Sequence, residues 1–189
     1  NCYNTGKVQG KNDNEQISIY VGGISGALNS NLSYCYNIGE VIGNSKSLRI
    51  GGITANQFTN TTVENVFNLG VLNIQASSLS AGGITGMTDG KSNININYAY
   101  NIGLIKVDDI NAKSIGSITS SKAQITFDNC YYLTGTYDVG VGKSETTQGV
   151  TELESIDEFP SVLDVVNKEG AFKEDTNNVN NGYPIMVWQ

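Results

Sequence analysis

The sequence predicts an all-β fold, a right-handed parallel β-helix (β-solenoid) followed by a small C-terminal α/β cap. Two short phrases recur along the 189 residues at one shared period of about 32 residues. Successive copies of the first phrase begin 33, 31, 33 and 31 residues apart. The segments between them carry no apolar stripe of helical period. Two phrases locked to one period indicate a stack of equivalent coils.

The first phrase reads small residue, aromatic residue, Asn, any residue, Gly, and the second reads Gly-Gly-Ile. Copies of the first phrase start at Cys2, Cys35, Val66, Ala99 and, in frayed form, Cys130. Copies of the second phrase start at Gly22, Gly51, Gly82 and, in degenerate form, Gly116. This phasing predicts about 4–5 coils near residues 2–34, 35–65, 66–98 and 99–129, with a partial coil from 130.

Each period contains three short segments with the composition of β-strands. One follows the Asn-x-Gly turn, the second is Gly-Gly-Ile, and the third leads into the aromatic phrase. There is no room for a crossover helix, so each strand is expected to pair in parallel with its equivalent one coil away, and right-handed crossovers are the strong default. Three apolar columns then fill the interior: Val8, Val41, Leu72, Ile105; Ile24, Ile53, Ile84, Ile118; and Leu32, Val63, Ile96, Phe127.

The polar and aromatic positions of the first phrase also form columns. The asparagines are expected to form a structural ladder of stacked amides and to supply the left-handed backbone of a sharp corner. The ladder consists of Asn4, Asn37, Asn68 and Asn101. The aromatic rings are expected to stack, but a corner within the phrase leaves their facing open. If they faced outward, they would also form a platform for sugars.

Cys2, Cys35 and Cys130 occupy the position that holds Val66 and Ala99 in other coils. This pattern predicts small buried side chains. A disulfide between Cys2 and Cys35 remains compatible with the distance between adjacent coils, whereas Cys130 is too far from either.

No catalytic residue, cofactor site or clustered metal site is predicted. The sequence has no His and one Arg. Asp108 and Asp109 form the one adjacent acidic pair of the repeats and are candidate calcium ligands. Adjacent strand residues point to opposite faces, so a solvated loop competes with that interpretation.

Residues 136–189 do not follow the repeated phrases and are predicted to cap the end of the solenoid. Without a cap, the last coil would expose unpaired backbone groups and the apolar interior. A capping box at 151–154 predicts a short helix ending near Phe159. A second helix would run from Pro160 to just before Gly170, and residues 181–189 predict a turn followed by a terminal strand.

The charge distribution argues against nucleic acid as a partner. Residues 1–135 hold eight acids and eight bases, so the net charge of −7 lies in the tail, and no basic stripe is present. No apolar run approaches the roughly 20 residues that span a bilayer, so no membrane insertion is expected. The chain opens inside a phrase, and we therefore expect a monomer with further repeats upstream in a longer protein.

The phrases at Asn1–Gly6 and Gly22–Gly26, and the closing residues 181–188, resemble the GLUG-type repeats of bacterial surface proteins. Similar repeats occur in secreted or wall-attached adhesin-like proteins and in accessory regions of some immunoglobulin A peptidases. The resemblance implies an extracellular location at the bacterial cell surface and no catalytic residues.

These observations favour a non-catalytic structural or adhesive module whose partner would be a host glycan or an extracellular-matrix protein. The alternative is a carbohydrate-active or carbohydrate-binding β-helix, such as a polysaccharide lyase, but such enzymes use paired carboxylates or acids with basic partners. A third hypothesis, an ice-binding face, rests on the column Ser25, Thr54, Thr85, Thr119. It lacks a second hydroxyl column beside it.

Overall fold

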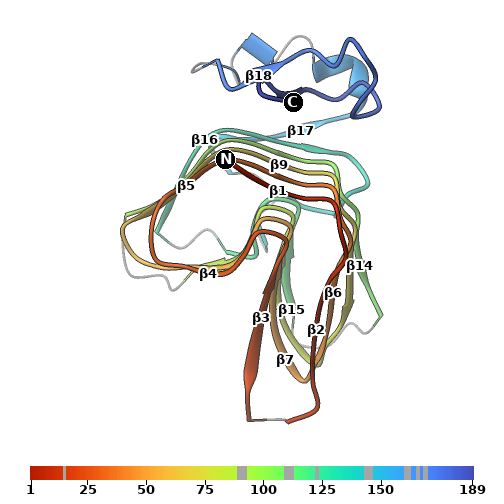
Figure 1. Cartoon of the computed structure of the whole chain (residues 1–189). Helices are drawn as coiled ribbons and strands as arrows, with labels where there is room; N and C mark the ends of the chain where they lie inside the picture. Colours follow the sequence, from red (N-terminus) through yellow and green to blue (C-terminus); the bar gives the residue numbers. More distant parts are fainter. Residues whose placement is uncertain are drawn as a thin grey trace.

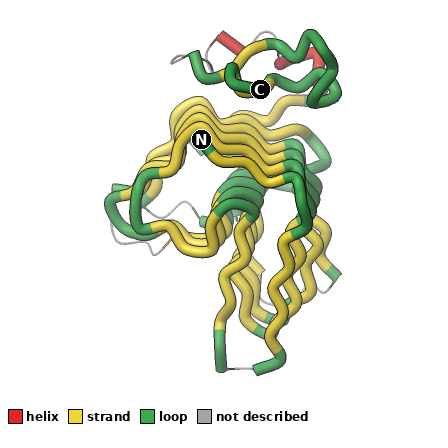
Figure 2. The backbone as a smooth tube through the Cα atoms, in the orientation of Figure 1, coloured by secondary structure: helices red, strands yellow, loops and turns green. Residues whose placement is uncertain are grey.

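The computed structural model confirms a β-solenoid of stacked coils (Figures 1 and 2). It describes residues 1–14, 16–88, 93–108, 113–121, 124–142, 147–159, 163–164, 167 and 170–189. Seen from the N-terminal coil, as in Figure 1, the chain runs clockwise while later coils lie farther away, which is a right-handed course. Parallel pairing in register joins each coil to the next throughout.

The strands lie in four parallel sheets, which we call sheets A to D in the order the chain visits them. Each of the first three coils contributes one strand to each sheet, and the described part of the fourth coil contributes to sheets A, B and C. Sheet A contains β1 (Cys2–Asn4), β5 (Leu32–Asn37), β9 (Thr61–Asn68), β13 (Ile94–Asn101), β16 (Ile125–Leu133) and β17 (Val150–Leu153). Sheet B contains β2 (Val8–Asn12), β6 (Val41–Ser45), β10 (Leu72–Gln75) and β14 (Ile105–Val107). Sheet C contains β3 (Ser18–Gly22), β7 (Ser47–Gly51), β11 (Ser78–Gly82) and β15 (Lys113–Gly116). Sheet D contains β4 (Ser25–Leu28), β8 (Thr54–Gln57) and β12 (Thr85–Thr88).

The coil therefore has four strands rather than the predicted three. The Gly-Gly-Ile phrase is a bend between sheets C and D instead of a strand. Glycine is required there because the coils approach closely: a Cβ on Gly52 would lie 2.1 Å from the carbonyl oxygen of Gly83 and 2.4 Å from Cγ of Asn68. Contacts this short exclude a side chain at Gly52.

The predicted apolar columns are present, and they divide between two interiors. The columns headed by Ile24 and Leu32 fill the space between sheets A and D. The column headed by Val8 fills a narrow arm in which sheets B and C pack face to face. The arm is the lower projection in Figure 1, formed by β2, β6 and β14 on one side and β3, β7 and β15 on the other.

Strands β5, β9, β13 and β16 of sheet A are each kinked by one residue in the left-handed region. These residues are Tyr34 (φ 56°), Asn65 (φ 51°), Tyr98 (φ 48°) and Asn129 (φ 51°). The extra residue lets Cys35 enter the interior while Tyr36 faces outward. The ladder asparagines do not have positive φ. The left-handed corner that the sequence analysis assigned to them is therefore wrong by three residues.

Backbone pairing continues past residue 136, where the sequence analysis places the cap. Ser117 and Ile118 donate to the carbonyls of Val139 and Gly140, both at 2.7 Å. Strand β17 then adds a sixth strand to sheet A, in register with β16. The helix predicted from Thr151 is thus a strand, since the edge of β16 supplies partners for an extended backbone.

Residues 154–189, which we call the C-terminal clasp, follow β17. A single 3₁₀ turn, η1 (Ile156–Glu158), is begun by Ser155, whose amide donates to the Glu158 carboxylate at 3.1 Å. Leu163 and Asp164 are helical, and Gly170 (φ 65°) ends the segment, while Pro160 and most of the predicted second helix lie outside the described residues. Strands β18 (Phe172–Lys173) and β19 (Ile185–Met186) pair antiparallel, so the predicted terminal strand is present but short.

Candidate functional site

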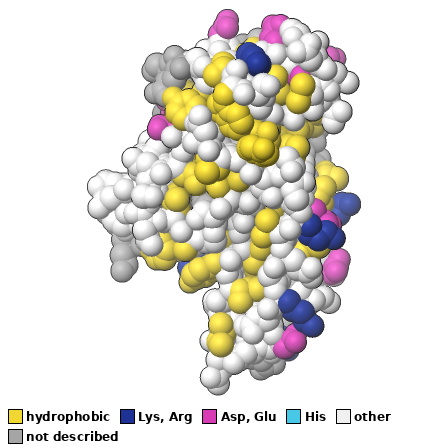
Figure 3. All heavy atoms as spheres, in the orientation of Figure 1, with side chains coloured by type: hydrophobic (Ala, Val, Ile, Leu, Met, Phe, Trp, Pro, Cys, Tyr) yellow, Lys and Arg dark blue, Asp and Glu magenta, His cyan; other side chains and the backbone are white. Residues whose placement is uncertain are grey.

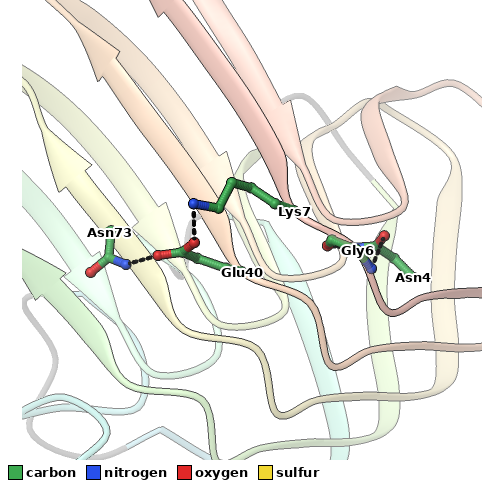
Figure 4. Close-up of polar contacts among 5 residues, drawn as sticks. All are labelled: Asn4, Gly6, Lys7, Glu40 and Asn73. Atoms are coloured by element: carbon green, nitrogen blue, oxygen red, sulfur yellow. Dashed lines mark hydrogen bonds and ion pairs between the residues drawn. The ribbon is translucent and has the colours of Figure 1, made fainter.

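The four ladder asparagines form one hydrogen-bonded column along the axis. The amide of Asn4 donates to Oδ1 of Asn37 at 2.7 Å, and the next two rungs repeat this at 2.8 Å. Each amide also donates to the carbonyl of the glycine two residues later and accepts that glycine's N–H, as Figure 4 shows for Asn4 and Gly6. Asn37, Asn68 and Asn101 are completely buried. The amides thus bond to one another within the stack, and the three buried asparagines are inaccessible to a ligand.

A second polar column crosses the coils on the outer surface where sheet B begins. The Lys7 ammonium lies 2.9 Å from the Glu40 carboxylate, which also accepts a hydrogen bond from the Asn73 amide (Figure 4). The Lys7 contact holds the pKa of Glu40 below its usual value. These exposed contacts connect three successive coils, and pairs of this kind contribute little to stability.

The aromatic rings of the phrase form a stacked column on the outer face of sheet A, which settles the facing that alternation left open. The ring centroids of Tyr3, Tyr36, Phe67 and Tyr100 are 5.4, 4.9 and 5.0 Å apart, with interplanar angles of 14°, 2° and 6°. Such stacked pairs contribute roughly 0.5–1.5 kcal/mol each beyond their burial.

The C-terminal clasp covers this column. Phe159 and Phe172 contact Tyr100 at centroid distances of 5.2 and 5.9 Å. Trp188 lies 5.5 Å from Tyr36 and 6.1 Å from Tyr3, at the other end of the stack. Residues 154–189 of the predicted cap therefore lie along the outer face of sheet A, where they contact rings from the first coil to the fourth.

Burial under the clasp removes most of the rings from solvent. The Tyr100 hydroxyl donates to the Pro184 carbonyl, and burial raises the pKa of Tyr100 well above its usual value. Tyr3 and Trp188 stay 60% and 37% exposed. Figure 3 shows apolar side chains along the junction between clasp and solenoid. A sugar platform along the whole column is not available while the clasp is in place.

The cysteines are free thiols, and Cys35 and Cys130 are buried in the interior column. Burial raises the pKa of the Cys130 thiol to about 12. Cys2 and Cys35 are register partners on β1 and β5, and Cys2 is exposed. The hydroxyl column also points inward, since Thr54, Thr85 and Thr119 are completely buried. This burial removes the basis of the ice-binding hypothesis.

Asp108 lies at the tip of the arm, on a polar hollow of about 400 Å³. Residues from four coils line it, among them Asn12, Asn44 and Gln75. Asp109, the other candidate calcium ligand, lies outside the described residues. Within the described part of the chain, no three His, Cys, Asp or Glu side chains gather where they could hold a metal ion. Of the two candidate calcium ligands, the structure thus describes Asp108 alone.

A polar cluster that the sequence analysis did not single out lies where sheets C and D meet. Arg49 of β7 donates from Nη1 to Oδ1 of Asn56 on β8 at 2.9 Å. The guanidinium carbon of Arg49 lies 5.0 Å from the ring centroid of Tyr20 on β3. The sequence signal was the single arginine of the chain, at a position that holds tyrosine or serine in the other coils.

Comparisons with known proteins bear on the fold. No protein-family model and no curated protein matches the chain. A crystal structure at 1.30 Å resolution, described as a "putative immunoglobulin A1 protease" from Bacteroides ovatus, resembles it with a TM-score of 0.72 and 23% identity. The match covers 100% of this chain and 57% of that one. The likeness places both among β-solenoid proteins, and this chain spans little more than half of its neighbour. The described residues contain no helix long and apolar enough to cross a membrane.

Proposed function

We propose that this chain is a non-catalytic structural and adhesive repeat module of a secreted or wall-attached bacterial surface protein. The proposal rests on one observation: the repeated polar and aromatic side chains are buried or contact other parts of the same chain. The amide column bonds to itself, the hydroxyl column is buried, and the rings lie under the clasp. The repeat thus encodes a scaffold, and recognition is left to surfaces that vary between coils.

The alternative of a polysaccharide lyase or another carbohydrate-active β-helix has less support. Such enzymes need carboxylates or basic groups held together beside the substrate. The described ion pairs, Lys7–Glu40 and Lys11–Asp13, are exposed contacts at the outer surface. Neither ion pair places two carboxylates across a substrate-sized gap.

Support for an accessory role comes from the resemblance of the repeats. Similar repeats occur in accessory regions of immunoglobulin A peptidases, and the structural neighbour is described as a putative immunoglobulin A1 protease. A solenoid beside a catalytic domain would serve as a spacer or as a binding arm.

The proposal is tested by presenting the purified chain to a glycan array and to immobilised extracellular-matrix proteins. We expect saturable binding to at least one of them and no cleavage of polyuronates or of immunoglobulin A. Turnover of either substrate by the chain would refute the non-catalytic assignment. Absence of binding on both surfaces would reject the adhesive role and leave the structural one.

A further inference from the structure

Arg49 faces outward from the arm, because its neighbours on β7, Leu48 and Ile50, are buried in the arm's interior. In the sheet C register it lies between Tyr20 of the preceding coil and Ser80 of the following coil. Ser114 pairs with Ser80 and continues the column. The outer face of sheet C therefore presents an aromatic ring, a guanidinium and two hydroxyls in line along the axis. The Ser114 hydroxyl already donates to the Ser120 carbonyl, so it is left as an acceptor.

Two contacts hold the guanidinium in one orientation. Tyr20 lies against the guanidinium, and the bond to Asn56 fixes one of its nitrogens. Asn56 is completely buried, and its Nδ2 has no hydrogen-bond partner. An unpaired buried donor costs roughly 1–3 kcal/mol. The fold tolerates that cost while the Asn56 carbonyl oxygen is turned to Arg49, so the amide acts as a support for the arginine.

Beyond Asn56 and the Tyr20 ring, the guanidinium has no polar partner among the described residues. Among the described residues, no carboxylate lies within 4.0 Å of Arg49, since the two ion pairs present involve Lys7 and Lys11. The bond to Asn56 is also its one hydrogen bond in the described chain. Guanidinium carries five N–H donors in a planar fork that matches a carboxylate. A pre-oriented cation without a counter-charge is suited to an external anion, because little further ordering is needed on binding.

We propose that Arg49 binds the carboxylate of a uronate-containing glycan on the outer face of sheet C. A glycan fits better than an acidic peptide because the groups in line with Arg49 are a ring and hydroxyls. They belong to Tyr20, which is 40% exposed, and to Ser80 and Ser114. Hydroxyls pair with sugar hydroxyls, and an aromatic ring packs on a sugar face. This inference rests on the proposed adhesive role, for which it names a ligand class and a site.

The test measures binding of oligogalacturonate by isothermal titration calorimetry, using the whole chain and three variants. Arg49→Gln removes the charge and the fork, and we expect affinity to fall by about tenfold or more, as for loss of a charged hydrogen-bonded pair. Arg49→Lys keeps the charge without the fork and should lose part of the affinity. Lys106→Gln removes one exposed charge from β14 on another face and should change affinity by less than about twofold.

The methyl ester of the same oligosaccharide is the ligand control, and we expect it to bind as weakly to wild type as the acid binds to Arg49→Gln. Circular dichroism checks that each variant is folded, and Arg49→Lys serves if Arg49→Gln is not. Failure of wild type to bind the oligosaccharide overturns the ligand class. Binding that Arg49→Gln leaves unchanged overturns the site while the adhesive role stands. Equal weakening by Lys106→Gln, or an equal dependence on Arg49 for an acidic peptide, also overturns the proposal.

Discussion

Replacing Asn68 with alanine tests the amide column where it is most enclosed. The Asn68 amide donates to the Gly70 carbonyl at 3.0 Å and to Oδ1 of Asn101 at 2.8 Å. Its carbonyl oxygen accepts from Nδ2 of Asn37 at 2.8 Å and from the Gly70 amide at 3.2 Å. The change therefore removes four hydrogen bonds from a site without access to water.

At about 1 kcal/mol net for each bond, the loss is about 4 kcal/mol, a large part of the roughly 5–15 kcal/mol that stabilises a domain. Asn4→Ala is the matched control at the same repeat position. Asn4 makes three such bonds, but its site is partly exposed, so water replaces some of them and we expect a loss of about 1 kcal/mol.

Urea unfolding followed by far-ultraviolet circular dichroism measures the free energy of unfolding of both variants. Because repeat arrays can unfold in parts, amide hydrogen exchange is measured alongside. The amides of Leu69 and Ile102, which donate to the carbonyls of Asn37 and Asn68, should lose protection in Asn68→Ala. A loss below about 1 kcal/mol, or equal losses for Asn68→Ala and Asn4→Ala, would show that the amide column contributes no more than its solvated end.

Three further predictions concern the coil spacing, the clasp and the buried thiol. Gly39→Ala should prevent stable folding because its Cβ would lie 1.9 Å from the Gly6 carbonyl oxygen. Gly6→Ala is the control and should be tolerated, because the nearest atom to its Cβ would be 3.8 Å away. Thermal unfolding of the two variants compares them. Phe172→Ala should cost about 3–5 kcal/mol and speed proteolysis within 154–189, and a clasp as resistant as wild type would contradict the packing described above. The raised pKa of Cys130, about 12, means that its thiol favours folding below its ordinary pKa of 9.0 and loses that contribution as pH rises toward 12. Cys130→Ala should therefore flatten the alkaline fall in unfolding free energy, and an unchanged fall would argue against it.

Periodicity predicted the features that depend on equivalent residues repeating at a fixed interval. The register of the apolar columns follows directly, since Val41 pairs with Val8 and Leu72 as their spacing requires. The Gly-Gly-Ile phrase was an ambiguous signal. Its glycines indicate an unusual backbone conformation or a close approach, and both a bend and the end of a strand are compatible with it. The extra strand of sheet C was missed because β3 and β7 share no repeated phrase, although both alternate serine, tyrosine or arginine with apolar residues as half-buried strands do.

Neither the location of the clasp nor the Arg49 cluster could be predicted from the sequence. The clasp lies on sheet A because a left-handed residue before Cys35 turns Tyr36 outward, and left-handed positions held by Tyr34 and Tyr98 carry no glycine signal. Arg49 and Asn56 are seven residues apart in the chain, and they meet because of the bend between sheets C and D. Neither the packing of the clasp on sheet A nor the Arg49–Asn56 bond is marked by residues that recur at the repeat period.

The contact between Trp188 and Tyr3 has a consequence for how the chain is made. Coils can assemble as they emerge during synthesis, since each needs only the one before it. The clasp cannot, because its last aromatic residue must return to the first coil, 6.1 Å from a ring 185 positions earlier. The outer rings of sheet A therefore stay uncovered until residues 154–189 have been synthesised, and a chain interrupted before them would expose a stripe of stacked aromatic rings.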